Sequence, residues 1–407
     1  MPESRYAALD RAQLAVLVPE LLLCGQLIDR SGMAWCIQAL GREGMAEVAI
    51  EEWAAASPIY TRRMQRALGF EGDDVVTIFK GLQLDIGAPP QFMDFRFSVQ
   101  DARHGAFHLD HCGALMDVEP MGPDYVRSMC HDIEDPTFDA TAVATHPRAQ
   151  IRPVHRPPRT PADRHPHCAW TVVIDDAHPE ALPSVGCLEL RDSHAAGLAL
   201  GPIDPADDGR ADYTGPLLSD LDFAAFSHSA LVRIADEVAL QMHLLSLGFA
   251  RALRHRLPGP EVTAIATKQL TGIAGLAAGR IHAALGLPPN EAGALQLLAL
   301  HPALNPAAYV RLETTGDALV VHESPAHADG GWPTRYGPHS PEPLRAIVHA
   351  VDEHLDVDIE GTERAWTVRI RRHAQPRPES DEVAVTRFST GSGFTFAPRR
   401  SLPITPV

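Results

Sequence analysis

The feature that most constrains the fold of this 407-residue chain is that its first half resembles its second half. Four stretches recur in the same order, which is the signature of a structural unit used twice. The alternative is two unrelated α/β domains with similar amphipathic patterns. Because the order is kept throughout, we expect a duplication. The matched stretches are 52–70 with 269–287, 95–109 with 310–323, 124–135 with 342–353, and 168–175 with 364–371.

Both copies show the same order of predicted elements. A helical region comes first, because apolar residues recur every three or four positions. Two alternating strands, a helix and a last strand follow. The sequence therefore predicts an α+β fold, a tandem duplication of a unit with helices packed on an antiparallel sheet. The leading helices are expected at 10–30 and 33–68 in the first copy, and at 226–256 and 261–286 in the second.

These patterns divide the chain into four parts. Residues 1–178 form the first repeat, and 226–374 form a second, degenerate repeat. Residues 179–225 are rich in turn-forming residues and are expected to be a linker. From residue 375 to 407 the composition predicts an extended tail that wraps the body. The separation of the last matched pair is shorter than that of the others, which places an insertion in the first repeat at 146–166.

Charge and composition narrow the classes of partner. The chain has 35 basic and 52 acidic residues, a formal charge of −17, which disfavours nucleic acid and anionic membrane surfaces as partners. No stretch suggests a membrane-spanning helix, and the start lacks the pattern of a secretory signal. We therefore expect a soluble cytoplasmic protein, and a homo-oligomer is compatible with the sequence. All six cysteines lie in the first half, where thiols, metal ligands or core residues are expected rather than disulfides.

Histidine and cysteine gather in three clusters of the first repeat, at 108–112, 130–135 and 165–168. The second repeat has no cysteine. If the clusters converge, their thiolates and imidazoles suit one transition metal, zinc, iron or copper. Singly, Cys130 and Cys168 fall on apolar stripes and are equally typical of a buried core. The candidate metal ligands are His108, His111, Cys112, Cys130, His167 and Cys168.

The candidate catalytic residues are Cys130, His131 and Glu134. Cys130 and Glu134 are four positions apart, so a helix places them on one face. With a metal, a bound water would be acidified, and Glu134 or His131 would act as the base. Without a metal, Cys130 is the expected nucleophile, activated by a histidine.

The insertion 146–166 contains six prolines and five arginines. Proline stiffens a loop, and arginine offers forked donors to a carboxylate or phosphate. We expect a lid over the site in which Arg152, Arg156 and Arg159 bind substrate, with Trp170 on the last strand as a further contact. The alternative is an arginine-rich surface loop that neutralises an acidic protein or contacts a subunit.

A family resemblance runs from Cys112 through CHDIEDPTFDA to RPPRTPADRHPHCAWTVVID. This region resembles the L-2-amino-thiazoline-4-carboxylic acid hydrolase-like family and, more distantly, the 4-vinyl reductase type of small-molecule-binding domain. It covers roughly 90–175 and, more faintly, 266–371. The resemblance implies a pocket for a small, carboxylated ligand between helix and sheet.

Together these observations predict a metal- or thiolate-assisted enzyme that acts on a small anionic molecule, most simply by hydrolysis of a C–N or C–S bond. One alternative is a non-catalytic sensor module that binds a small molecule or a metal. A further alternative is an iron- or copper-dependent redox enzyme, which would use the same ligands.

Overall fold

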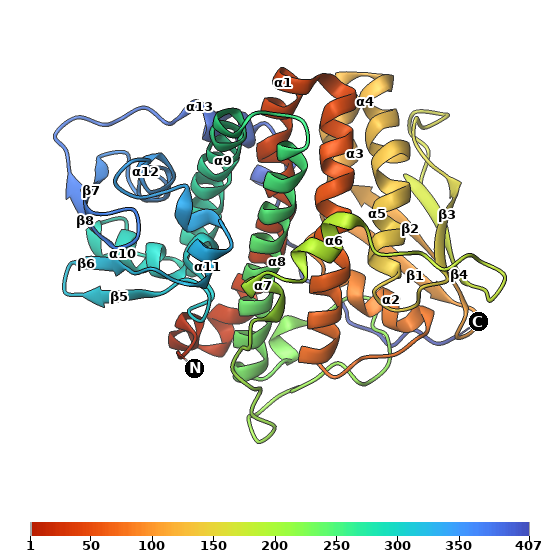
Figure 1. Cartoon of the computed structure of the whole chain (residues 1–407). Helices are drawn as coiled ribbons and strands as arrows, with labels where there is room; N and C mark the ends of the chain where they lie inside the picture. Colours follow the sequence, from red (N-terminus) through yellow and green to blue (C-terminus); the bar gives the residue numbers. More distant parts are fainter. Residues whose placement is uncertain (1, 407) are drawn as a thin grey trace.

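Two helical hairpins form the centre of the molecule, and a unit of sheet and helices lies on each side of them (Figure 1). The structure is a computed structural model that describes residues 2–406. The first hairpin is α1 (Arg11–Ala67), which turns back at Gly41, and the second consists of α8 (His228–Arg254) and α9 (Gly259–Leu285). The break in α1 was expected near residue 31, but it lies at Gly41, whose φ of 73° favours glycine.

Each flanking unit contains a four-stranded antiparallel sheet. The strand order is β1-β2-β4-β3 in the first and β5-β6-β8-β7 in the second, which is the same topology. This confirms the predicted α+β class with a duplicated unit. The strands are β1 (Met93–Val99), β2 (His104–Cys112), β3 (Ala149–His155), β4 (Cys168–Ile174), β5 (Leu312–Thr315), β6 (Ala318–Val321), β7 (Leu355–Gly361) and β8 (Trp366–Arg372).

The register of the two sheets is also the same. The sequence match equates Trp170 with Trp366, and the residues opposite them, Phe107 and Val321, are equated by the match of β2 with β6. The other residue pairs between β6 and β8 correspond in the same way to pairs between β2 and β4. Since a slip of one residue would invert every side chain, an equal register means that equivalent residues face the same side in both repeats.

One strand in each repeat was missed. The sequence predicted three strands, but β3 and β7 add a fourth at the edge of each sheet. The predicted insertion at 146–166 is therefore wrong at its start, because 149–155 is strand β3. The segment that is longer in the first repeat is the connection 156–167, which corresponds to only 362–365 in the second.

The two hairpins are joined by a symmetry-related pair of buried ion pairs. Arg63 Nε lies 2.9 Å from Glu237, and Arg280 Nε lies 2.6 Å from Glu20. Arg63 and Arg280 are equivalent in the sequence match, and Glu20 and Glu237 share the same separation along the chain. Each repeat therefore supplies an arginine to the other, as two subunits of a symmetric dimer would.

We expect substitution of Arg63 by methionine to lower the free energy of unfolding by about 2 kcal/mol. The reason is that Glu237, 2% exposed, would keep only its pair with Arg233 to compensate its buried charge. Urea denaturation measures this. Arg66→Met is the matched control, because Arg66 pairs with Glu71 on the surface and should contribute less than about 1 kcal/mol. Equal effects of the two substitutions would contradict the structural role of the cross-repeat pair.

Segments predicted as linker and tail are partly helical and well packed. Residues 179–225 include α6 (Val185–Leu190), α7 (His194–Gly197) and the short η4 (Phe223–Ala225), and they bury Cys187 and Tyr213. The tail forms α13 (Asp381–Arg387) and η7 (Thr390–Gly393).

The tail also contacts the first repeat. Thr390 bonds to Asp117, and Arg399 Nη1 lies 2.6 Å from Asp94, both in the first repeat. Apart from η1 (Arg5–Ala8), the remaining helices are α2 (Val75–Leu82), α3 (Gly113–Val118), η2 (Glu119–Met121), α4 (Pro123–Arg127), η3 (Ser128–Ile133), α5 (Glu134–Ala142), α10 (Glu291–Leu300), η5 (Pro302–Leu304), α11 (Pro325–Ala328), η6 (Trp332–Thr334) and α12 (Glu342–His349).

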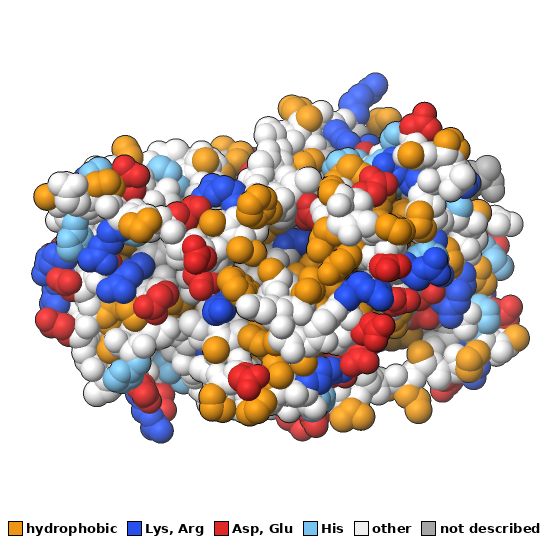
Figure 2. Space-filling view, turned by 90° about the horizontal axis from the view of Figure 1, so that it is seen from above, with side chains coloured by type: hydrophobic (Ala, Val, Ile, Leu, Met, Phe, Trp, Pro, Cys, Tyr) orange, Lys and Arg blue, Asp and Glu red, His pale blue; other side chains and the backbone are white. Residues whose placement is uncertain are grey.

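One helix among the described residues, α1, is long and apolar enough to cross a membrane by length and composition, contrary to the expectation from sequence. Of its apolar window, 67% is buried inside the protein, as in the core helix of a soluble protein. Figure 2 shows acidic and basic side chains interspersed over the visible face, as expected of a surface in contact with water.

Candidate functional site

A small cavity of about 70 Å³ lies in the first repeat, between the two legs of α1 and the segment that runs from η3 into α5. Its walls combine apolar side chains with an unusual number of charged ones. The segment 128–133 is a π-helix, a rare form that is frequent at functional sites. The polar and charged lining residues are Gln26, Asp29, Arg30, Ser57, Tyr60, Asp85, Glu134, Thr137 and Thr141.

Arg30 is the buried cation of this cavity. It is 8% exposed, and its Nη2 donates to Asp29 Oδ2 at 2.7 Å. Its Nε and Nη1 are buried without a hydrogen-bond partner among residues 2–406. A buried donor without a partner costs about 1–3 kcal/mol, more when it is charged. Two free donors on a buried guanidinium are therefore suited to bind an anion.

Two carboxyl groups near this cation have strongly raised pKa values. Burial raises the pKa of Glu134 to about 8, although Arg156 and Arg30 act in the opposite direction. Burial, together with the charge of Asp29, raises the pKa of Glu52 well above its usual range. Glu134 is therefore mostly protonated at pH 7, and its Oε2 has no partner within the described chain. A protonated carboxyl can donate a proton or a hydrogen bond to a ligand.

A third carboxyl, Asp85, is held in a different state. Burial raises its pKa to about 6, against hydrogen bonds from the Gly87 amide and the Tyr60 hydroxyl that favour the charged form. Tyr60 Oη donates to Asp85 Oδ1 at 2.8 Å, and Gly87 N donates to the same atom at 2.7 Å. At pH 7 Asp85 is mostly ionised and Glu134 mostly protonated. Two carboxyl groups with separated pKa values in one cavity are suited to act as base and acid.

The second repeat does not carry the charges of α1 at the equivalent positions, although Glu134 corresponds to another carboxylate, Asp352. The spacing that equates Glu20 with Glu237 and Arg63 with Arg280 also equates α1 with the second hairpin. Small or uncharged residues replace the charged and hydroxyl-bearing ones. The replacements are Asp29 by Ser246, Arg30 by Leu247, Glu52 by Gln269, Ser57 by Ala274 and Tyr60 by Ala277. Because the second repeat forms the same fold without the charges of α1, these charges are candidates for a functional role in the first repeat.

Of the predicted catalytic residues, only Glu134 lines the cavity. Cys130 is 2% exposed. Its burial raises the pKa of its thiol well above the usual range, and Glu134, Cys112 and Cys168 add to the shift. His131 Nε2 lies 2.7 Å from the carbonyl oxygen of Pro157, so it ties η3 to the connection 156–167. Cys130 is thus a protonated core thiol in this structure, as its place on an apolar stripe also suggested.

The three predicted cysteine ligands lie close enough to affect one another's pKa, whereas the predicted histidine ligands lie in other surroundings. Cys112 and Cys168 are buried, with Cys112 Sγ 3.6 Å from Met93 Sδ. His108 is on the outer face of the sheet, 3.3 Å from Asp110. His111 and His167 lie near each other, with ring centroids 6.1 Å apart, and burial lowers the pKa of His167 to about 4.

These donors do not fit one metal centre. Among residues 2–406 no group of three or more histidine, cysteine, aspartate or glutamate side chains is placed to hold a metal ion. A zinc site needs donor atoms about 2.0–2.3 Å from the ion, so its ligands must nearly touch. We therefore assign no chemical step to a metal bound by these residues.

The predicted substrate-binding arginines each pair with a carboxylate of the same repeat. Arg152 lies 2.9 Å from Asp139, and Arg156 bonds to Asp135. Arg159 makes two hydrogen bonds to Glu119, at 3.0 and 2.9 Å. None of the three lines the cavity. These contacts agree with the alternative interpretation of the insertion, in which its arginines neutralise acidic groups of the protein rather than bind substrate.

Trp170, the fourth predicted substrate contact, is fully buried in the sheet core, 4.9 Å from the ring of Phe138. Phe138 itself lines the cavity, whereas Trp170 does not. Trp170 therefore packs behind Phe138 in the cavity wall and does not itself line the cavity.

Sequence reasoning missed Arg30, Asp29 and Asp85. A signal for the first two was present, because Asp29-Arg30 interrupts the apolar run LLLCGQLI on a helix that should be buried. Charged residues are almost never fully buried unless they are paired or functional. Asp85 gave no comparable signal, since DIG is a common turn sequence.

The raised pKa of Glu134 predicts a pH-dependent stability difference. The unfolded chain loses this proton near the usual pKa of 4.5, whereas the folded protein keeps it until about 8. The stability of the wild type should therefore fall as pH rises through this window, by up to about 1 kcal/mol per unit. The variant Glu134→Gln cannot ionise at this position, so its stability should fall less than that of the wild type over the same pH range. Urea midpoints of both proteins at pH 5 and pH 8 measure this, and parallel pH dependence would contradict a buried, protonated Glu134.

Comparison of the chain with protein-family models, curated proteins and solved structures finds no match, so the interpretation of this site rests on its own residues.

Proposed function

We propose that the first repeat is a hydrolytic enzyme for a small carboxylate, with the second repeat as its structural support. The observation that carries the proposal is the buried Arg30, whose Nε and Nη1 lack partners in the described chain beside a cavity that Glu134 also lines. A ligand carboxylate would accept hydrogen bonds from these two donors. Charge-assisted bonds of this kind are about twice as strong as neutral ones.

The reaction that fits the two remaining carboxyl groups is addition of water to a carbon bonded to nitrogen or sulfur. Asp85, ionised at pH 7, takes a proton from a water molecule while the oxygen of that water forms a bond to the carbon. The C–N or C–S bond breaks with its electron pair on the leaving atom, and Glu134 gives that atom its proton. Proton exchange with solvent then restores both carboxyl groups. The resemblance of residues 90–175 to the amino-thiazoline-carboxylate hydrolase-like family supports this choice of bond.

A covalent route through Cys130 has less support. The nucleophilic form of cysteine is the thiolate, and burial raises the pKa of Cys130 well above its usual range. We therefore assign Cys130 to the core. A redox enzyme with iron or copper would need a set of donors that the described residues do not provide in one place.

The second candidate is a binding module of the 4-vinyl reductase type, which holds a small carboxylate without turnover. The small size of the cavity, about 70 Å³, favours it, because a substrate and an attacking water would both have to fit. In either case we expect the protein to act in the cytoplasm as a soluble molecule.

One experiment tests the proposal and separates the two candidates. Thermal unfolding is followed with formate, acetate, propionate and L-2-amino-thiazoline-4-carboxylate, with the corresponding amides as uncharged controls. Incubated samples are analysed by mass spectrometry for addition of one water. We expect the carboxylates alone to raise the melting temperature, and the thiazoline to be hydrolysed. Stabilisation without hydrolysis would favour the binding module, and equal effects of acids and amides would contradict both candidates.

A further inference from the structure

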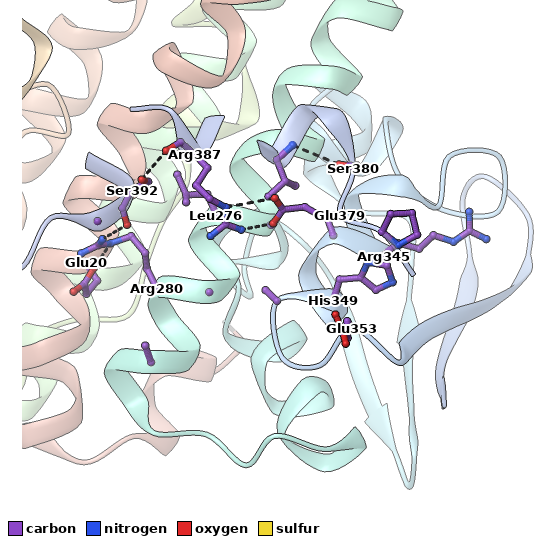
Figure 3. A pocket seen from close by; sticks show the side chains of 18 of the residues that line it. Glu20, Leu276, Arg280, Arg345, His349, Glu353, Glu379, Ser380, Arg387 and Ser392 are labelled. Atoms are coloured by element: carbon purple, nitrogen blue, oxygen red, sulfur yellow. Dashed lines mark hydrogen bonds and ion pairs between the residues drawn. The ribbon is translucent and has the colours of Figure 1, made fainter. Parts of the chain in front are cut away.

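A second site lies in the repeat that lacks the charged cavity. A groove of about 930 Å³ runs between α9, α12 and the tail (Figure 3). This volume is typical of pockets that bind small organic molecules. The floor is apolar and built from small residues of α9, among them Gly275, Gly279 and Ala283. The rest of the lining comes from α12 and from two stretches of the tail, around residues 378 and 393.

The width of the groove depends on residues that differ between the repeats. The first repeat has an equivalent groove of about 540 Å³. Arg62 and Arg66 stand in it at the positions of Gly279 and Ala283. Long side chains therefore occupy the floor in one repeat, and the floor is open in the other. The degenerate repeat has lost one site and holds a different one.

Basic side chains form one wall of this groove. Arg345 and His349 come from α12, and Arg377 comes from the tail. The buried carboxylate of Asp356 fixes both arginines, at 3.0 Å from Arg345 Nε and 2.8 Å from Arg377 Nη2. One carboxylate thus positions two guanidinium groups beside His349. His349 Nε2 is buried without a hydrogen-bond partner within residues 2–406.

Acidic residues also line the groove, and most of them pair with its arginines. Glu379 pairs with Arg387, and Glu20 with Arg280, on the opposite side of the groove (Figure 3). Glu342 lies 3.7 Å from Arg345, where an exposed pair contributes little. Glu353 is exposed and lies next to His349 (Figure 3). An apolar floor beside a basic wall suits a ligand with an apolar body and an anionic head.

We propose that this groove binds a medium-chain carboxylate, with its chain along α9 and its carboxylate on Arg345, His349 and Arg377. The site is separate from the cavity of the first repeat, and it stands whether or not that cavity is catalytic. The carboxylate gains charge-assisted hydrogen bonds, and burial of the apolar chain adds to the affinity with each methylene group removed from water.

The test is calorimetric titration of the whole protein with octanoate. Acetate supplies the head without the chain, and octanol supplies the chain without the charge. We expect octanoate to bind at least ten-fold more tightly than either, because both parts are needed. Binding of octanol as tight as octanoate, or no binding of octanoate, would overturn the proposal.

Three variants locate the binding. Gly279→Arg restores the side chain that the first repeat carries, and it should weaken octanoate binding at least ten-fold. This variant should fold, because a Cβ at Gly279 meets only Ala350 Cβ, at 4.0 Å. Arg345→Gln should weaken binding by a similar factor. Arg371→Ala is the matched control, since Arg371 pairs with Asp358 outside the groove, and it should leave binding unchanged.

The double variant Asp29→Ser/Arg30→Leu separates this groove from the cavity. It should leave octanoate binding unchanged, because neither residue lines the groove. Loss of octanoate binding in this variant, or full binding in Gly279→Arg, would place the ligand elsewhere and overturn the proposal.

Discussion

Replacement of Asp29 by serine and Arg30 by leucine should abolish binding of small carboxylates to the first repeat, with at least a hundred-fold loss of affinity. These are the residues that the second repeat carries at Ser246 and Leu247. The loss follows because the ligand charge would enter a buried cavity with no cation to compensate it. Titration with the carboxylate that binds the wild type most tightly measures the effect.

The same double variant should fold and be at least as stable as the wild type. It removes both members of a buried ion pair, which avoids leaving one charge without its partner, and it introduces the serine and leucine that the second repeat buries at Ser246 and Leu247. Arg30→Leu alone is the informative comparison, because it leaves Asp29 buried without its 2.7 Å partner and should destabilise the protein. Full carboxylate binding by a folded double variant would show that Arg30 is not the anion site.

Glu134→Gln should lower turnover of any hydrolysed substrate at least a hundred-fold while carboxylate affinity changes little. General acid catalysis contributes about 10²- to 10⁴-fold, and glutamine keeps the shape of the side chain but cannot donate a proton in this way. The matched variant is Cys130→Ser, which should retain most of the activity because Cys130 is assigned to the core. The reverse result, with Cys130 essential and Glu134 dispensable, would favour the covalent route.

The pH profile of turnover provides an independent check. Asp85 must be ionised and Glu134 protonated, so the rate should rise near pH 6 and fall near pH 8. Asp85→Asn should remove activity by eliminating the base. A rate that rises continuously through pH 8 would instead indicate that Glu134 acts as a carboxylate.

The fold could be predicted largely because the duplication leaves matched residues at fixed positions. The twin Trp170 and Trp366 strands aligned the sheets correctly, and apolar spacing predicted the leading helices, although it misplaced the turn in α1. The edge strands β3 and β7 were missed for a physical reason. An edge strand faces solvent and tolerates proline and charge, so Pro153 and Arg152 made 149–155 resemble a loop.

The candidate site was only partly predictable. Glu134 was identified from its position beside Cys130 on a helix, and it lines the cavity. Arg30 precedes it by about a hundred residues and is brought there by the packing of α1 against η3, with Arg30 Nη2 3.7 Å from Met129 Sδ. The histidines attracted attention through their number, but strand alternation directs His108 to the outer face of the sheet, away from the buried thiols.

The most direct test of the central claim is a crystal structure of the wild-type protein with a bound small carboxylate. The account predicts carboxylate oxygens within about 3.2 Å of Arg30 Nε and Nη1, with the ligand in contact with Glu134. A carboxylate held by Arg152, Arg156 or Arg159 on the surface, with Arg30 unchanged, would contradict it.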